Sequence, residues 1–255
     1  MHAPRCPAPA AAAHASAAPR VRRKPLCTSL PATLLLALVA SRAYAQFSGT
    51  VSLLSDYRYR GVSLTDDQPA AQLGVVYDDP RNWYVGAVAT TAITHCAGAC
   101  AGVQAVSYAG YAWRQPSGVT LDAGLDVWFS TASQRYSFAE MYAGFTYVNT
   151  SGRVYYAPRY FGQDTPSVYV EVTQTLPVHD RVRLLGHVGL LHVGNTGPYP
   201  YGPSNATDVL LGAAVDVAPV ELRLTWQHVT SLPYPYPVAI GDRRSRFVVQ
   251  VSYGF

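Results

Sequence analysis

The sequence contains few charged residues and almost no lysine. Charged residues make up 13% of the 255 positions, and Lys24 is the single lysine. Six of the 19 cationic residues lie before residue 46 and all 15 acidic residues lie after it, so the chain from residue 46 onward is slightly acidic. This balance argues against a nucleic-acid partner, which needs a block of basic side chains. The 49% hydrophobic content argues against a disordered chain.

Long apolar runs are also scarce, and the segment from Leu30 to Ala40 is too short to span a bilayer as a helix. It lies between the cationic stretch from Arg20 to Lys24 and the small-x-small motif Ala43-Tyr44-Ala45, which is the three-part form of a secretory signal. We therefore expect residues 1–45 to be a cleaved signal peptide and residues 46–255 to be exported. An uncleaved anchor helix is the alternative. The Ala/Pro-rich opening is unusual for a signal, and a true start codon further along, such as that of Val21, would explain it.

Cysteine is rare, and cleavage would leave Cys96 and Cys100 alone in the segment HCAGACAG. In an oxidising compartment this C-x3-C spacing favours a local disulfide that stiffens a loop. Two free thiols are the second interpretation. A metal site with His95 is the third, although zinc ligands usually come in two pairs. We expect no metal and no cofactor.

From Phe47 onward apolar and polar residues alternate with a period of two, which predicts strands with one apolar and one polar face. Turn residues separate twelve such segments, and no amphipathic helix is expected. The expected strands are 47–60, 70–78, 83–94, 103–113, 119–130, 140–149, 153–161, 167–175, 182–193, 208–217, 220–230 and 247–255.

The strand lengths and connections favour a membrane barrel over a soluble sandwich. Most strands have the length that crosses a bilayer at barrel tilt. Short connections, such as 79–82 and 218–219, alternate with longer ones, such as 61–69, 95–102 and 231–246, which is the asymmetry of an outer-membrane barrel with both termini inside. The fold class is therefore all-β: a single antiparallel transmembrane β-barrel of about twelve strands.

Aromatic side chains beside the short turns lie on the apolar face, where they would form a ring at the inner lipid interface. These are Phe47, Tyr77, Trp83, Tyr111, Trp113, Tyr147, Tyr253 and Phe255. A sparser outer ring would consist of Tyr57, Tyr59, Phe129, Tyr160 and Phe247.

The polar faces of the strands carry many charges, which would face the barrel lumen and include Arg159. Our candidate pore-lining residues are Arg58, Arg60, Asp122, Asp126, Glu171 and Arg223. We place Arg58 and Arg60 as neighbours on the polar face of the first strand. Charges of both signs in a narrow bore either pair and close it or segregate to opposite walls and create a transverse field. The sequence leaves both arrangements open.

The segment VSLLSDYRYRGVSLTDDQPAAQLGVVY, from Val51 to Tyr77, resembles the opening of the TorF-type porin family of small Gram-negative outer-membrane barrels. The phrase from Ser55 to Ser63, followed by Pro69, carries most of the likeness. The stretch from Ser107 to Phe129 and the terminal VSYGF also resemble that family. Because the family has no established substrate, the resemblance implies location and class more than function.

We expect the terminal Phe255 to be read by the barrel-assembly machinery, and outer-membrane lipid and small polar solutes to be the other partners. The sequence has no G-x-S-x-G or H-E-x-x-H motif, and His95, His179, His187, His192 and His228 form no catalytic pattern. The expected function is a narrow passive pore for small polar or charged solutes. The alternatives are a closed structural or surface-recognition barrel with working Pro-Tyr loops (198–203 and 233–237) and, third, an outer-membrane enzyme.

Overall fold

The computed structural model describes residues 46–96, 98–131, 136–194, 204–231 and 244–255, and for residues 93–101 it describes the backbone alone. Twelve of its strands form one closed barrel. These are β1 (Phe47–Leu54), β4 (Ala70–Asp78), β5 (Trp83–Cys96), β6 (Gly98–Arg114), β7 (Val119–Ser130), β8 (Phe138–Tyr147), β9 (Thr150–Ala157), β10 (Ser167–His179), β11 (Val182–Val193), β12 (Asn205–Val217), β13 (Val220–Val229) and β14 (Ser245–Gly254).

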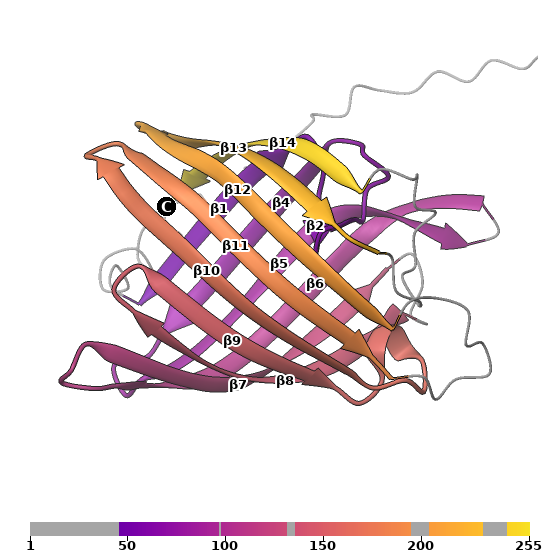
Figure 1. The fold of residues 1–255 in the computed structure, drawn as a ribbon, viewed down its shortest axis with the longest axis horizontal. Helices are drawn as coiled ribbons and strands as arrows, with labels where there is room; N and C mark the ends of the chain where they lie inside the picture. Colours follow the sequence, from indigo (N-terminus) through magenta and orange to yellow (C-terminus); the bar gives the residue numbers. More distant parts are fainter. Residues whose placement is uncertain (1–45, 97, 132–135, 195–203, 232–243) are drawn as a thin grey trace, which may run out of the picture. The chain divides into compact units, whose positions relative to one another are not determined.

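Each barrel strand pairs antiparallel with its two neighbours, and β1 closes the barrel by pairing with β14, where Val51 lies opposite Tyr253. Figure 1 shows the strands running obliquely around the barrel. Closure pairs every barrel strand with a neighbour on each side, so the barrel has no edge strand. The expected fold class, an all-β antiparallel barrel of twelve strands, is confirmed. Within the described residues, no helix is long and apolar enough to cross a membrane.

The expected alternation of side chains sets the two faces of the barrel wall. In β1, Val51 and Leu53 are 44% and 62% exposed on the outside, whereas Ser52 between them is buried inside. The same pattern recurs around the barrel, so large apolar side chains cover the outer surface. An apolar exterior around a polar interior is the arrangement of a barrel whose outside contacts lipid.

The connections sort by length as expected, but two differ from the expected external loops: 61–69 folds into the barrel, as described below, and 95–102 forms a hairpin. Tight connections such as 115–118 and 218–219 lie at the end of the barrel where β1 starts and β14 ends. At the opposite end, the expected loop 95–102 is instead a strand hairpin in which Cys96 pairs with Gly98. This hairpin extends past β4, whose pairing with β5 stops at Gln72 and Thr90, and Figure 1 shows it projecting beyond the neighbouring strands.

The expected ring of aromatic side chains is present at the tight-turn end. Phe47 packs on Tyr77 with ring centroids 4.7 Å apart, and Trp83 packs on Tyr111 at 4.9 Å. Phe255 is 64% exposed beside Tyr253. These rings lie where an amphipathic aromatic girdle meets a membrane interface.

The expected outer ring is partly wrong. Phe129 and Phe247 do face outward, but Tyr160 is fully buried and Tyr59 packs on Trp128 inside the barrel at 4.4 Å. Tyr160 belongs to a short 3-10 turn, η2 (Tyr160–Gly162), in the connection after β9. Loop aromatics therefore fold into the barrel mouth instead of continuing along the strands.

The first strand is shorter than the alternation indicated. β1 ends at Leu54, and residues 55–69, which we call the plug, turn into the barrel and form the two-residue strands β2 (Arg58–Tyr59) and β3 (Val62–Ser63). At the tip of the plug Gly61 has a φ of +75°, and a Cβ there would lie 2.8 Å from the Cβ of Asp208 on β12. Only glycine fits this combination of positive φ and close approach.

The plug joins the main hydrophobic cluster of the barrel. Val62 is 1% exposed and packs with Trp128, Phe138 and Phe161, and with other inward residues of β9 to β13. This cluster lies at the long-loop end, away from the aromatic ring at the tight-turn end. Apolar packing therefore holds the plug against one side of the mouth.

Candidate functional site

The lumen contains many of the charged residues, and the plug carries the first group of them. Asp56 is fully buried and accepts hydrogen bonds from Arg58 at 3.0 Å, Ser63 at 2.5 Å and Thr65 at 2.9 Å. Arg58 also donates from Nε to the carbonyl of Gly61 at 2.9 Å. Arg58 is therefore held mainly by the plug itself.

Arg60 points away from the plug to the opposite wall. Its Nη2 donates to both carboxylate oxygens of Glu140 on β8, at 2.9 Å each, and the hydroxyl of Tyr59 donates to the same carboxylate at 3.0 Å. The guanidinium also lies over four tyrosine rings, with distances from Cζ to the ring centroids between 4.2 and 5.5 Å. These are the rings of Tyr59, Tyr155, Tyr160 and Tyr169.

We call Glu140 and these four tyrosines the Arg60 cage. A carboxylate and several aromatic faces around one cation form a strong binding environment, because each face adds a cation–π attraction. Arg60 itself has a φ of +49°, an uncommon conformation for a residue with a side chain. The expected placement of Arg58 and Arg60 on the polar face of the first strand is thus wrong, although both side chains do lie in the lumen.

Asp126 on β7 lies directly opposite Glu140 on β8 in the sheet register. It is 8% exposed, and its Oδ1 has no hydrogen-bond partner among the described residues. A buried carboxylate oxygen without a partner is costly, and such an atom indicates a site where a ligand or an ion can be held. The cage therefore has a second acidic side chain beside it.

Asp122 belongs to a separate network on the same wall, nearer the tight turns. Arg153 on β9 donates to Asp122 at 2.7 Å, and Tyr84 on β5 donates to the same oxygen at 3.0 Å. Tyr84 also shares a hydrogen bond of 2.8 Å with Tyr142, whose ring lies 5.0 Å from the Arg153 guanidinium. These contacts fix the side chains of β5, β7, β8 and β9 against the wall.

Glycines opposite these tyrosines make the flat packing feasible. A Cβ at Gly110 would lie 2.4 Å from the hydroxyl of Tyr84, and one at Gly124 would lie 2.4 Å from that of Tyr142. Each glycine faces its tyrosine across the strand pair. The absence of a side chain lets the ring cover the neighbouring strand, as aromatic residues do over glycines in other sheets.

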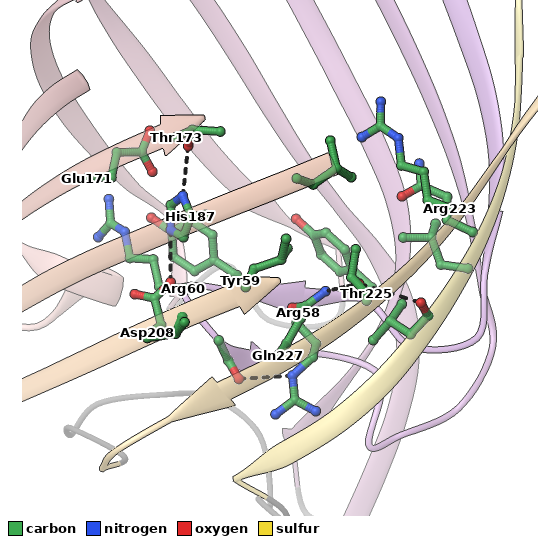
Figure 2. Close-up of a pocket in the computed structure, with 18 of the residues that line it drawn as sticks. Arg58, Tyr59, Arg60, Glu171, Thr173, His187, Asp208, Arg223, Thr225 and Gln227 are labelled. Carbon is green, nitrogen blue, oxygen red and sulfur yellow. Dashed lines mark hydrogen bonds and ion pairs between the residues drawn. The ribbon is translucent and has the colours of Figure 1, made fainter. Parts of the chain in front are cut away.

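A third network links β10, β11 and β12. His187 Nε2 lies 3.0 Å from Asp208 and its Nδ1 lies 2.8 Å from the hydroxyl of Thr173, as Figure 2 shows. Tyr169 donates to both oxygens of Asp208, at 3.1 and 3.2 Å. The order carboxylate, imidazole, hydroxyl resembles a hydrolytic triad, but the strands carrying it are paired along their length, so their backbone amides are committed to the sheet.

Two cavities lie in the lumen. One of about 640 Å³ lies beside the plug, and Arg58, Arg60, Asp126, Glu171 and Arg223 line it. Another of about 880 Å³ lies toward the tight-turn end, where residues near the ends of β1, β12 and β14 line it. The residues common to both are Gln72, Glu221, Arg223 and Gln250.

Charges also pair where the cavities meet. Glu221 forms ion pairs with Arg183 and with Arg223, and Arg183 donates to Asp216 at 2.8 Å. Figure 2 shows Arg223, which is on β13, apart from Arg58 and Arg60 of the plug. Unlike the plug, this group is open to solvent, since Arg223 is 43% exposed.

The structure divides the six candidate pore-lining residues into two groups. Five of the six pore-lining candidates face the cavity beside the plug, and Asp122 is instead enclosed in the tyrosine network. Arg159, which the alternation also put in the lumen, is 67% exposed in the connection after β9, where it pairs with Asp164. The side chains of Cys96 and Cys100 lie outside the described residues, so their disulfide stays a prediction. No group of three metal-ligating side chains occurs among the residues with described side chains.

Sequence reasoning missed the network of Asp208, His187 and Thr173. The alternation does predict that each of these three side chains faces the lumen, because each lies at an inward-facing position of its strand. Nothing in one strand indicates that three neighbouring strands are aligned so that these side chains meet. That alignment appears only in the register, where Thr173 lies opposite His187.

Comparisons with known proteins agree with this architecture. A model of the family described as "bacterial protein of unknown function (Gcw_chp)" matches residues 40–232. No curated protein matches the sequence. Among solved structures, the NanC porin is similar with a TM-score of 0.53 and 12% identity, covering 82% of this chain and 98% of its own. A membrane protein from a study of in-meso crystallization has a TM-score of 0.51 and 9% identity, with 82% and 83% covered. At these identities the similarity is one of fold.

Proposed function

Because this chain belongs to the Gcw_chp family of bacterial proteins, whose function is unknown, we propose a function from the lumen itself: a narrow outer-membrane channel for passive passage of small polar or charged solutes. The proposal includes export by a signal peptide in residues 1–45, and a place among TorF-type porins. Its partners are outer-membrane lipid, the barrel-assembly machinery through Phe255, and small polar solutes.

The series of two cavities is the observation that carries this proposal. They share Glu221 and Arg223 and extend along the interior of a closed barrel with an apolar exterior. A barrel of twelve strands falls between barrels of about eight strands, which side chains fill, and those of about sixteen, which leave an open channel. Conductance should accordingly be low and selectivity marked.

The sign of the selectivity follows from the side chains that line the cavity beside the plug. Six carboxylates face four guanidiniums there, and several of the pairs neutralise each other locally. Glu171 and Asp208 have no arginine partner among the described ion pairs and accept hydrogen bonds from tyrosines. A negative balance in a narrow bore favours cations.

The second candidate is a closed structural or surface-recognition barrel. It is favoured by the buried pair of Arg60 with Glu140 and by the partly buried pair of Arg153 with Asp122, which fix charges instead of leaving them to solutes. In that case the working parts would be the Pro-Tyr segments 198–203 and 233–237, which lie outside the described residues. An enzyme is the third candidate, and the Thr173, His187 and Asp208 network is its single support.

Planar-bilayer recording of the refolded protein tests the proposal. We expect small, resolved current steps and a reversal potential that indicates cation preference in a salt gradient. Leak without steps at any voltage would favour the closed barrel, and deleting residues 231–246 would then test the external loops. Heat-modifiable gel migration and recovery in the outer-membrane fraction check the location, and recovery in a soluble fraction would contradict it.

A further inference from the structure

The cage around Arg60 is built mostly by the barrel wall, whereas the cation inside it belongs to the plug. Glu140, Tyr155 and Tyr169 are on β8, β9 and β10, and Tyr160 is in the connection between β9 and β10. Arg60 reaches them from the plug, which is attached to β1 and β4. The wall therefore presents a site for a cation, and a side chain of this same chain fills it.

The chemistry of the site matches a guanidinium group. Both oxygens of Glu140 accept from Arg60 at 2.9 Å, and four ring faces lie within 5.5 Å of its Cζ. A planar guanidinium suits this combination better than an ammonium, because it stacks on rings while its N–H groups reach a carboxylate. Beside it, the buried Oδ1 of Asp126 has no partner among the described residues and faces the same cavity. A free ligand could donate a hydrogen bond to this oxygen, whereas Arg60, which is tethered to the plug, donates to Glu140.

We propose that the cage is a binding site for solutes that bear a guanidinium group, and that Arg60 occupies it as a tethered competitor. A solute that binds there displaces Arg60 and breaks its ion pair with β8, while Tyr59 and the apolar cluster still hold the plug to the wall. Binding to the cage stands on the geometry alone. The conclusion that guanidinium solutes are the cargo of the channel rests on the proposed function.

Because Arg60 competes for the cage, the quantity to measure is the affinity of the cage for a free solute with and without Arg60. A tethered group has an effective concentration on the order of millimolar, so a free solute binds the wild-type cage more weakly than it binds an empty one. Replacing Arg60 should empty the cage without altering its walls. Arg60→Gly is the suitable change, because glycine accepts the positive φ at this position.

The experiment follows thermal unfolding of the refolded protein in detergent during titration with methylguanidinium chloride. Arg60→Gly should unfold at a lower temperature than the wild type, and methylguanidinium should raise its transition temperature to a plateau. The half-saturating concentration should be at least about tenfold lower than in the wild type. Sodium chloride at equal ionic strength should give no plateau. A response to methylammonium of the same size would overturn the guanidinium assignment, and so would the absence of a plateau.

A matched control is Arg58→Gly, because Arg58 binds Asp56 and Gly61 within the plug instead of the cage. It should lose stability without gaining a methylguanidinium response. An equal response in this variant would contradict the site. Adding Glu140→Gln to Arg60→Gly should remove the response, since the cage then lacks its carboxylate.

If Arg60→Gly does not fold, the wild type supplies the test through Trp128, which packs on Tyr59 of the plug at 4.4 Å. Methylguanidinium should change the tryptophan fluorescence saturably, and the change should be absent in Trp128→Phe. No such change would overturn the proposal. Because neither readout uses current, a failure of the cage and a failure of the channel are distinguishable.

Discussion

Arg60 and Glu140 are separated by 80 positions in the chain, yet Nη2 of the arginine lies 2.9 Å from both oxygens of the carboxylate inside the barrel. Their side chains are 4% and 1% exposed. The pair connects the plug to the wall opposite its attachment. The position of the plug therefore depends on this buried ion pair as well as on apolar packing.

The first prediction concerns the strength of this pair. Arg60→Gln should lower the free energy of unfolding by about 3 kcal/mol, because it leaves Glu140 buried without its cation. Glu140→Gln should cost a similar amount. The double variant should lose less than the sum of the single losses, and urea unfolding in detergent measures all three. Strict additivity would show that the two residues do not interact.

The second prediction concerns the bore. Arg58→Gln with Arg60→Gln removes the Arg58 contacts inside the plug and the ion pair of Arg60 with the wall. The single-channel conductance should rise, and thermal stability should fall. Planar-bilayer recording gives the first quantity. Arg159→Gln, an exposed loop position paired with Asp164, serves as the control and should change neither. Unchanged conductance in the double variant would show that the plug does not limit the current.

The third prediction concerns charge where the two cavities meet. Arg223→Gln removes a cation that lines both cavities and leaves Glu221 with Arg183 as its remaining partner. The reversal potential in a salt gradient should shift toward that of a more cation-selective channel. Arg114→Gln, at a tight turn outside both cavities, should leave it unchanged. A shift toward anions would contradict the assignment of the current path to these cavities.

The fourth prediction compares two glycines on β11. A Cβ at Gly189 would lie 2.0 Å from the hydroxyl of Tyr169 and 2.5 Å from Asp208, whereas one at Gly186 meets nothing within 4 Å. Gly189→Ala should lower the free energy of unfolding by about 1–3 kcal/mol, because the network must shift. Gly186→Ala should stay within about 0.5 kcal/mol of the wild type. Equal effects in urea unfolding would show that the tyrosine does not rest on Gly189.

The fold could be predicted from the sequence because each of its signals is local. Alternation within a strand such as Val119 to Ser130 determines which side chains face out, and loop length separates the two ends of the barrel. The β5–β6 hairpin and the connection 61–69, which is part of the plug, were the exceptions among the connections. Small residues such as those from Gly98 to Gly102 are typical of a loop, but they can also extend a paired ladder.

The plug could not be predicted for the same reason. From Phe47 to Tyr59 one face is largely apolar, and the exchange of polarity at Leu54 and Ser55 is too small a break to show that β1 stops there. What turns the chain inward is the contact of Gly61 with β12 and of Arg60 with Glu140, and both partners are distant in sequence. The alternation predicted which types of residue line the lumen. It could not predict which of them pair, because pairing depends on the strand register and on this inward turn.

The plug begins where β1 ends and finishes where β4 starts, and these two strands are hydrogen-bonded neighbours in the barrel wall. It is thus a loop whose two ends are attached to adjacent strands of the barrel. Swinging it aside breaks none of the twelve strand pairings, so opening is a first-order event within one molecule. Its rate is independent of protein concentration. Because the plug is part of the same chain, dilution does not remove it from the lumen.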